Sequence, residues 1–286
     1  MQRTIYINGL YVPEAEAQIS IFDRGFLFGD GIYEVSAVIG GHMIDNDLHL
    51  DRLERSLREL DIPMPASREE IVAMQKTLIA RNALDEGVVY LQVTRGSEDR
   101  NFDYGDAIEP NFVAFTQAKK LVDTNALKDG VKVALVDDIR WRRRDIKTVM
   151  LLAQVQAKRQ AKAQGCTEAW MVQDGFITEG ASSTAFIVTQ AGKIVTRPNS
   201  QATLPGCTRR AVLRVADDHG LQVEERLFTA DEAYLAREAF LTSASSLVTP
   251  VVEIAGHRIG EGKPGPVTRR IQQIYLELAF GQAATA

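Results

Sequence analysis

Lys147 is the first residue whose chemical type and surroundings point to catalysis. It ends the segment DDIRWRRRDIK and stands directly before an apolar stretch that begins near Val149. A lysine amine attacks an aldehyde only in its neutral form, which burial and neighbouring cations such as Arg140 or Arg144 favour. Lys147 is therefore a candidate for forming a Schiff base with a carbonyl compound. The alternative is an ordinary solvated basic edge.

Glu179 is the second candidate, in the segment FITEGASST between two predicted strands and directly before Gly180. A buried carboxylate beside a heteroaromatic nitrogen keeps a pyridine ring protonated, and a protonated ring accepts the electrons of a carbanion. The alternative interpretation of Glu179 is an acidic residue in a turn.

Two polar segments could bind an anion. Gly206, Cys207 and Thr208 precede an amphipathic helix, and unpaired N–H groups at a helix N-terminus favour a phosphate. The alternative there is a simple glycine-containing helix start. The polar run 242–246 could donate hydrogen bonds to the same phosphate, or could form a turn between a strand and a helix.

Arg100 lies in TRGSEDRNF, on a polar loop that follows a predicted buried strand. Loops at strand ends often hold substrates on a rigid scaffold, and the guanidinium fork matches a carboxylate. Arg100 is therefore a candidate carboxylate ligand, with an ordinary surface arginine as the alternative.

The composition narrows the class of protein. The chain has 286 residues, 45% of them hydrophobic and 25% charged, with a formal net charge of -5. Such a chain can bury a large core, and its acidic balance argues against nucleic acid or an anionic membrane as the main partner. The two cysteines have no disulfide pattern or metal-ligand spacing, and no apolar run reaches the roughly 20 residues of a membrane span. We therefore expect a cytoplasmic protein that binds small molecules and holds no metal.

Local patterns predict an α+β fold with mainly antiparallel sheets and flanking helices, since strands outnumber helices and tight turns join them. The expected N-terminal elements include a hairpin over residues 4–12 that turns at Asn8-Gly9 and a helix opened by a capping box of Ser67 and Glu70. The other predicted elements are a helix with Leu48, Leu53, Leu57 and Leu60 on one face, strands over 88–94, 112–116, 168–172 and 185–189, and helices over 149–164, from 206 and over 267–279.

Two domains are expected from the length and from a polar stretch near the middle of the chain. The predicted boundaries are an N-terminal α+β domain over residues 1–120, a linker over 121–130 and a C-terminal domain over 131–286. The Rossmann glycine pattern is missing, which argues against a nicotinamide dehydrogenase.

Together, several ordered segments resemble the fold-type IV class of pyridoxal-phosphate enzymes, and within it most closely the bacterial D-amino acid aminotransferases. The resemblance covers nearly the whole chain. The segments that carry it are DRGFLFGDGIYEV (23–35), HLDRL (49–53), YLQVTRG (90–96), DIRWRRRDIK (138–147), TEG (178–180), LPGCTR (204–209) and the TS...TPV pattern (242–251).

This resemblance implies a two-domain enzyme with an α/β barrel-like C-terminal domain and pyridoxal 5'-phosphate at the domain interface. It implies that the enzyme transfers amino groups between a D-amino acid, such as D-alanine or D-glutamate, and a 2-oxo acid. It also implies a homodimer in which a second subunit supplies the arginine at position 100. The implied roles are Lys147 as Schiff-base residue and proton shuttle; Glu179 as partner of the pyridine nitrogen; Arg52, Cys207, Thr208, Ser243 and Ala244 around the phosphate; Leu204 against the ring; Glu168 in a hydrogen-bond network near the lysine; and Tyr33, Arg100 and Phe102 around the substrate carboxylate.

Two positions depart from the D-specific pattern. Arg100-Asn101-Phe102 stands where those enzymes carry R-x-H, and a lost charge-assisted hydrogen bond is worth roughly 1.5 to 3 kcal/mol. Thr184 replaces a common asparagine near the expected phenolic oxygen of the cofactor. The alternatives of the same fold are a branched-chain L-aminotransferase, an (R)-amine transaminase and an aminodeoxychorismate lyase. From another class, the alternative is a non-catalytic nucleic-acid-binding protein that uses RWRRR.

Overall fold

The computed structural model describes residues 2–285 and divides the chain into two compact units. Unit 1 comprises Met1–Lys120, Ile146–Met150 and Phe280–Ala286, and unit 2 comprises Leu121–Asp145 and Leu151–Ala279. The short segment that carries Lys147 therefore groups with the N-terminal residues. The outer ends of the two predicted domains, Met1 and Ala286, lie outside the described residues. The predicted domain boundaries stay a prediction.

Unit 1 is built on a six-stranded sheet in the order β2-β1-β6-β5-β3-β4, in which every described pair of neighbours is antiparallel. The strands are β1 (Thr4–Ile7), β2 (Leu10–Pro13), β3 (Gly31–Ile39), β4 (His42–Ile44), β5 (Gly87–Thr94) and β6 (Asn111–Ala118). The helices are η1 (Glu14–Glu16), α1 (Arg24–Phe28), α2 (Asn46–Glu59) and α3 (Arg68–Arg81).

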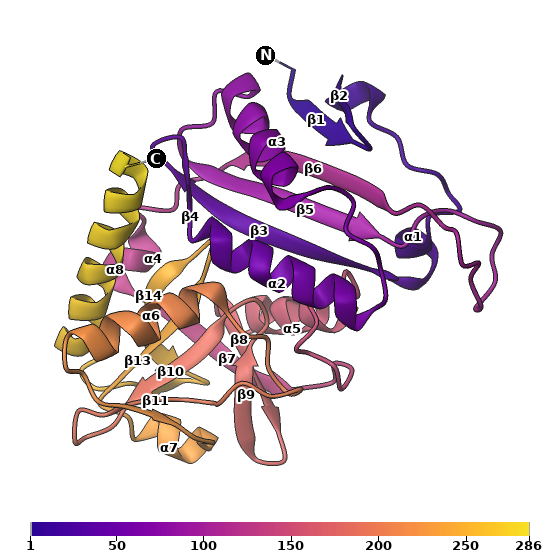
Figure 1. Ribbon diagram of the computed structural model, residues 1–286. Helices are drawn as coiled ribbons and strands as arrows, with labels where there is room; N and C mark the ends of the chain where they lie inside the picture. Colours follow the sequence, from indigo (N-terminus) through magenta and orange to yellow (C-terminus); the bar gives the residue numbers. More distant parts are fainter. Residues whose placement is uncertain (1, 286) are drawn as a thin grey trace. The chain divides into compact units, whose positions relative to one another are not determined.

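Strand alternation decides which side chains of unit 1 meet the helices. Successive side chains of a strand point to opposite faces, so Ile32 of β3 joins the core with Leu53 of α2 and Leu78 of α3. Figure 1 shows α2 and α3 on the same face of this sheet. Tyr33, the next residue of β3, points to the opposite face and is only half-buried. The face of β3 opposite the helices therefore carries one of the predicted site residues.

Two local predictions in unit 1 are confirmed. Asn8 and Gly9 both have positive φ, 46° and 90°, as a two-residue hairpin turn requires, and β1 pairs with β2. Ser67 and Glu70 form the complete capping box at the start of α3.

Unit 2 contains a nine-stranded mixed sheet in the order β12-β11-β10-β13-β14-β7-β8-β9, with β15 paired to β14. β7 runs parallel to β8 and β14, β11 runs parallel to β12, and the other pairs are antiparallel. The strands are β7 (Val131–Asp137), β8 (Glu168–Gln173), β9 (Phe176–Gly180), β10 (Thr184–Val188), β11 (Ile194–Thr196), β12 (Val223–Glu225), β13 (Glu238–Ser243), β14 (Leu247–Ile254) and β15 (His257–Arg258). The helices are α4 (Asn125–Asp129), α5 (Leu152–Ala163), α6 (Cys207–Asp218), α7 (Ala230–Tyr234) and α8 (Pro266–Thr285), and α8 belongs to unit 2 as far as Ala279.

One predicted helix begins later than expected. A helix was predicted from about Val149, but α5 begins at Leu152. The N–H of Val149 instead donates to the carbonyl of Gly31 at 3.0 Å, and Thr148 bridges to Ile32 of β3. Pairing with a strand holds this segment extended, which the apolar pattern alone does not reveal.

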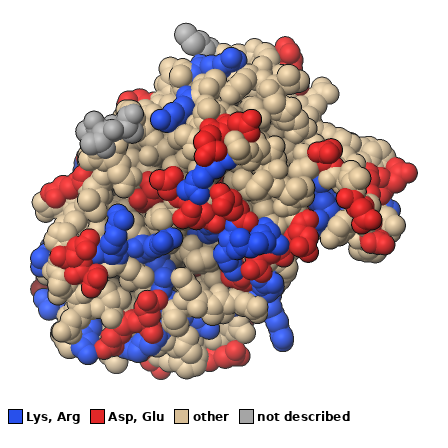
Figure 2. All heavy atoms as spheres, in the orientation of Figure 1, with Lys and Arg blue, Asp and Glu red and all other residues tan. Residues whose placement is uncertain are grey.

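The structure confirms an α+β fold with mainly antiparallel sheets. Within residues 2–285, no helix combines the length and the apolar character that crossing a membrane requires. On the face drawn in Figure 2, basic and acidic side chains lie interspersed.

Candidate active site

In unit 1, Lys147 lies beside Tyr33. The main-chain N–H of Tyr33 donates to the carbonyl of Lys147 at 3.0 Å, which places the segment along the edge of β3. The Nζ atom of Lys147 lies over the aromatic ring of Tyr33, 4.2 Å from its centroid. Both side chains are half-buried. The structure thus brings together the predicted amine and one predicted substrate residue.

Tyr33 belongs to a row of stacked aromatic rings. Its ring stacks on Tyr90 at 5.6 Å between centroids, and Tyr90 stacks on Phe115 at 4.7 Å. Burial raises the pKa of Tyr90, and the neighbouring Tyr33 raises it further. The phenol of Tyr90 donates to Gln92 at 2.8 Å. The rings of Tyr90 on β5 and Phe115 on β6 therefore give Tyr33 an uncharged and rigid support.

Arg52 is held by a buried acid that the sequence had not singled out. Its Nε and Nη2 atoms donate to the two carboxylate oxygens of Glu34 at 2.7 and 2.8 Å, and the Nδ1 atom of His49 lies 2.8 Å from the same carboxylate. Burial by itself raises the pKa of Glu34, but the charge and hydrogen bonds of Arg52, together with His49, outweigh it and lower that pKa to about 2. A bidentate pair of this kind fixes the plane of the guanidinium.

Glu34 and His49 both lie inside segments that carried the family resemblance, 23–35 and 49–53. Glu34 lies on β3 and His49 on α2, 15 positions apart, so no local sequence pattern links them. The family resemblance was therefore the one signal in the sequence that pointed to this pair.

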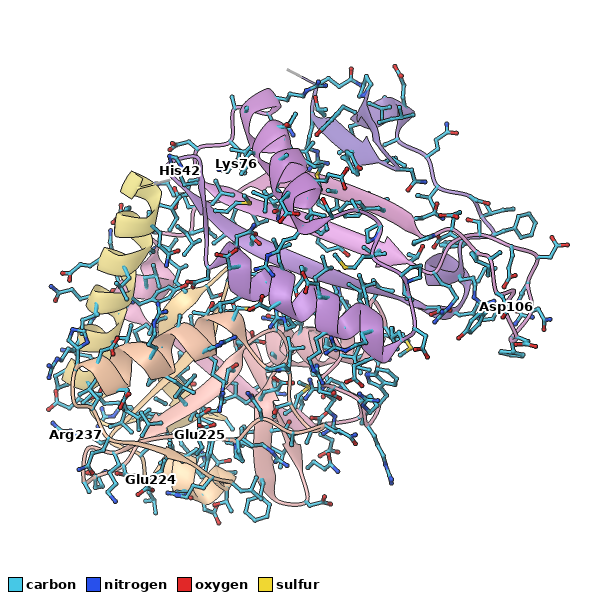
Figure 3. The ribbon with its side chains drawn as sticks, in the orientation of Figure 1. His42, Lys76, Asp106, Glu224, Glu225 and Arg237 are labelled. Atoms are coloured by element: carbon cyan, nitrogen blue, oxygen red, sulfur yellow. The ribbon has the colours of Figure 1, made fainter. Side chains whose placement is uncertain are left out.

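Arg100 and Phe102 lie in the loop of residues 95–110 between β5 and β6. Phe102 is 80% exposed, and the guanidinium of Arg100 lies 5.5 Å from its ring and 5.4 Å from the ring of Phe28. Within residues 2–285, no hydrogen bond, ion pair or ring contact joins Arg100 to Lys147 or Tyr33 of the same chain. In Figure 3 the labelled Asp106 marks this loop beyond the ends of the two strands.

In unit 2, Glu179 is buried on β9 with donors on both carboxylate oxygens. The Nη1 atom of Arg140 donates to Oε1 at 2.6 Å, and the main-chain N–H of Leu204 lies 3.1 and 3.2 Å from the two oxygens. Burial raises the pKa of Glu179, and Arg140 offsets this only in part. A further positive group beside this carboxylate would favour its charged form and lower its pKa again.

Arg140 and Arg144 bind groups of their own unit. The guanidinium of Arg140 also donates to both oxygens of Asp138, at 2.9 and 2.7 Å, and Arg144 donates to Gln173 at 2.6 Å. The side chains of Arg140 and Asp138 are 6% and 0% exposed. Arg140 therefore braces Glu179. Only the folded structure shows this contact, because the two residues lie 39 positions apart in the sequence.

The N-terminus of α6 has no side-chain cap, which is compatible with an anion site. Gly206 is its N-cap residue, no side chain accepts from the first turn, and the following residues Cys207 and Thr208 are buried. A Cβ atom at position 206 would lie 2.8 Å from the Oγ1 atom of Thr184, so this close approach requires glycine. The predicted residue Thr184 thus lies against the start of α6.

Donors suited to a phosphate also stand at the end of β13, against which α6 packs. Within the described part of the chain, the buried Oγ1 of Thr242 and Oγ of Ser243 have no hydrogen-bond partner. Ala244 follows in the turn between β13 and β14. Buried hydroxyls without partners are costly unless a ligand satisfies them, so these residues fit a bound phosphate.

Glu168, at the start of β8, contacts groups of its own unit. Its Oε2 atom accepts from Ser182 at 3.1 Å and from Ser183 at 3.3 Å, and lies 2.7 Å from the Nζ atom of Lys158. These contacts fix the turn between β9 and β10, which follows Glu179.

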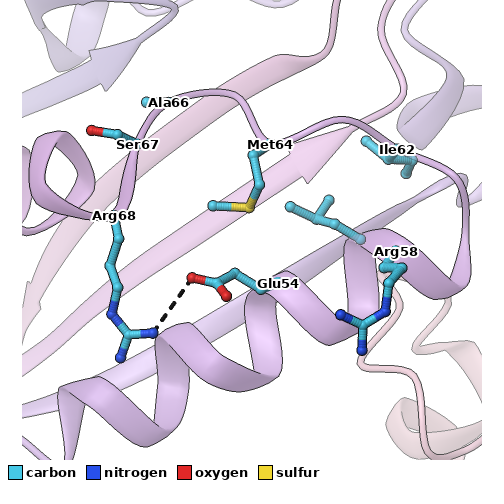
Figure 4. Close-up of a pocket in the computed structure, with 8 residues that line it drawn as sticks. Glu54, Arg58, Ile62, Met64, Ala66, Ser67 and Arg68 are labelled. Atoms are coloured by element: carbon cyan, nitrogen blue, oxygen red, sulfur yellow. Dashed lines mark hydrogen bonds and ion pairs between the residues drawn. The ribbon is translucent and has the colours of Figure 1, made fainter.

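A cavity of about 400 Å³ in unit 1 contains none of the predicted site residues. It lies between α2 and the start of α3, where Glu54 and Arg68 pair (Figure 4). Its lining residues are Glu54, Leu57, Arg58, Ile62, Met64, Ala66, Ser67 and Arg68.

The sheet topology and the residues of the two units define an enzyme of the fold-type IV class. The chain belongs to the family described as Amino-transferase class IV, whose pattern matches residues 31–254. It is a pyridoxal-phosphate-dependent aminotransferase that acts on an amino acid and a 2-oxo acid.

Two kinds of relative support this assignment. The D-alanine aminotransferase of Bacillus licheniformis is 37% identical over 268 residues, covering 94% of each chain, and that of Staphylococcus aureus (strain MSSA476) is 37% identical over 270 residues, covering 94% of this chain and 95% of the relative. Among solved structures, the T.th. branched-chain amino acid aminotransferase with pyridoxamine 5'-phosphate has a TM-score of 0.91 at 26% identity, covering 99% of this chain and 95% of the other. The branched-chain enzyme of Escherichia coli has the same TM-score at 23% identity, with 99% and 96% covered, and shows the shared fold.

Proposed function

We propose that this aminotransferase transfers amino groups between a D-amino acid, such as D-alanine or D-glutamate, and a 2-oxo acid. The observation that carries the proposal is the position of the Lys147 amine over the ring of Tyr33, 4.2 Å from its centroid. A carboxylate bound next to Tyr33 lies on a fixed side of the amine, and this side decides which face of the substrate presents its α-proton. The 37% identity to D-alanine aminotransferases supports the D-configuration.

Arg52 of unit 1 and the predicted cofactor residues of unit 2 are assigned to pyridoxal phosphate. Arg52, the start of α6 at Cys207 and Thr208, and the Ser243-Ala244 turn would bind the phosphate, Leu204 would pack against the ring, and Glu179 would hold the proton of the ring nitrogen. When bound, pyridoxal phosphate supplies an aldehyde that takes up the amino group and a ring that accepts electrons.

Lys147 would hold the cofactor through its amine and, once released, carry the α-proton between the two carbon atoms that exchange it. Glu168 would act indirectly, since it fixes the turn that follows Glu179.

Tyr33, Arg100 and Phe102 are assigned to the substrate carboxylate. We propose a homodimer in which the 95–110 loop, which carries Arg100 and Phe102, reaches the site of the other subunit. The apolar side chains of Phe26 and Phe102, 74% and 80% exposed, support burial of this region against another subunit.

The proposal is tested by following the absorbance of the bound cofactor as single substrates are added. D-alanine should convert the cofactor to its amino form, and L-leucine should leave the spectrum unchanged. Conversion by L-leucine alone would assign the enzyme to the branched-chain L-aminotransferases and overturn the D-specific proposal.

The role of Lys147 is tested separately by borohydride reduction and peptide mass mapping. The cofactor mass should appear on the peptide that contains Lys147 in the unmodified enzyme and be lost in Lys147→Gln. Lys193→Gln, which removes a surface lysine paired with Glu224, is the matched control and should keep the label. A label on any other lysine would overturn the assignment.

A further inference from the structure

Arg24, the first residue of α1, holds the loop that carries Arg100 and Phe102. The side chain of Arg24 is 5% exposed. Its Nη1 atom donates to the carbonyl of Asn101 at 2.7 Å, and its Nη2 atom donates to the carbonyl of Phe102 at 3.2 Å. These are the two main-chain carbonyls that directly follow Arg100. A single buried cation thus fixes the backbone on which both proposed substrate residues stand.

Two carboxylates, those of Asp30 and Glu98, also accept hydrogen bonds from the guanidinium of Arg24. Nε of Arg24 donates to Asp30 at 3.1 Å, and Nη1 also donates to Glu98 at 3.0 Å, so all three nitrogen atoms are engaged. Asp30 is in turn held by Arg95, whose Nε and Nη2 atoms donate to its carboxylate at 2.7 and 3.2 Å. The charges of the two arginines and two acids balance, and the planar fork of arginine satisfies four acceptors at once.

The same arginine also contacts two aromatic rings. Its guanidinium carbon lies 4.8 Å from the ring centroid of Phe28 and 5.2 Å from that of Tyr104, a residue of the same loop. Phe28 is the residue over which Arg100 also lies, at 5.4 Å. Phe28 and Phe102 contact each other at 5.6 Å. The position of Arg100 is therefore tied to Arg24 through the backbone and through a shared ring.

We infer that Arg24 is a positioning residue for substrate binding, which acts by holding the Asn101 and Phe102 carbonyls so that Arg100 presents its guanidinium to the substrate carboxylate. This inference rests on the proposed function of Arg100 and Phe102. The donors of Arg24 are engaged by Asp30, Glu98 and the two loop carbonyls. A lysine at position 24 keeps the charge but offers one nitrogen in place of three, and therefore cannot hold both carbonyls and both acids.

The test compares holoenzymes carrying Arg24→Lys, Arg24→Gln, Arg100→Gln and the double change Arg24→Gln with Arg100→Gln. Both Arg24 variants should raise the KM for D-alanine by about tenfold or more, the effect of losing one charge-assisted contact, while kcat changes by less than about threefold. Hydrogen exchange of the amides in residues 97–106 should become faster. Cofactor content should stay the same, because the cofactor residues lie elsewhere.

The double variant separates positioning from a general structural role. If Arg24 acts through Arg100, adding Arg24→Gln to Arg100→Gln should raise the KM no further. Arg68→Gln is the matched control, since Arg68 pairs with Asp51 and Glu54 on α2, away from the loop. It should leave both the KM and the loop exchange unchanged.

Each outcome decides one point. A KM within twofold of the unmodified enzyme in both Arg24 variants, or effects that add in the double variant, would overturn the positioning role of Arg24. If Arg24→Gln loses cofactor or folds poorly, Arg24→Lys and Glu98→Gln are judged by the same KM and exchange criteria. An unchanged KM in Arg100→Gln would instead overturn the proposed function of Arg100.

Discussion

Replacing Glu34 with glutamine should destabilise the enzyme strongly although the side chain keeps its size. The carboxylate of Glu34 is 1% exposed and receives two hydrogen bonds from Arg52 and one contact from His49. In Glu34→Gln the side chain of Arg52, 7% exposed, loses the negative charge of its buried partner. Removing one member of a buried ion pair commonly costs about 3 to 5 kcal/mol, because the remaining charge stays desolvated.

The lowered pKa of Glu34 agrees in direction with this loss and indicates a stabilisation of the same order. A fall from 4.5 to about 2 corresponds to about 3 kcal/mol, at roughly 1.4 kcal/mol per pKa unit. Because the folded-state pKa lies below the unfolded value, this stabilisation is fully present above pH 4.5 and is lost as the pH falls towards 2. The glutamine variant has no such titration. By about pH 3, more than half of the difference between the two proteins should have disappeared.

The assay is urea unfolding of both proteins freed of cofactor, so that no bound phosphate compensates the charge of Arg52, followed by far-ultraviolet circular dichroism at pH 7 and at about pH 3. Glu54→Gln on the same helix as Arg52 is the matched control: its pair with Arg68 is 3.4 Å long and 42% exposed at the acid, so its loss should cost less than about 1 kcal/mol. A loss in Glu34→Gln no larger than in this control, or one that does not shrink at low pH, would refute the reasoning.

Two further predictions concern unit 2. Gly206→Ala should lower stability by about 1 to 3 kcal/mol and weaken cofactor binding, because the new Cβ meets Thr184 Oγ1 at 2.8 Å; thermal unfolding and cofactor titration measure both, and the added change Thr184→Ala should restore stability if that contact is the cause. Glu179→Gln keeps the shape of the side chain but removes its charge, so the half-reaction with D-alanine should slow by about 100-fold or more, while a stopped-flow rate within threefold of the unmodified enzyme would contradict the role assigned to this carboxylate.

Most elements were predictable from the sequence because their causes are local. A hairpin turn at Asn8-Gly9 depends on the positive φ of two adjacent residues, and the capping box depends on Ser67 and Glu70, three positions apart. The glycine before α6 was recognisable for the same reason. The family resemblance, which depends on ordered segments along the whole chain, correctly identified the fold class, the aminotransferase activity and the cofactor.

The start of α5 shows where local reasoning failed. Val149 and Met150 continue an apolar pattern that favours a helix, but hydrogen bonds to the edge of β3 hold the segment extended and delay the helix to Leu152. This pairing also places Lys147 in unit 1. Local propensity amounts to a few tenths of a kcal/mol per residue, so backbone pairing with a strand far away in sequence overrides it.

By itself, the sequence determined the types of chemistry available and the turns, caps and strands whose causes lie within a few residues. Only the tertiary structure decided which charges meet: that Glu34 holds Arg52, that Arg140 braces Glu179, and that Arg24 holds the loop of Arg100. The physical reason is that a buried ion pair depends on the distance and desolvation of two groups, and neither quantity exists until the chain has folded.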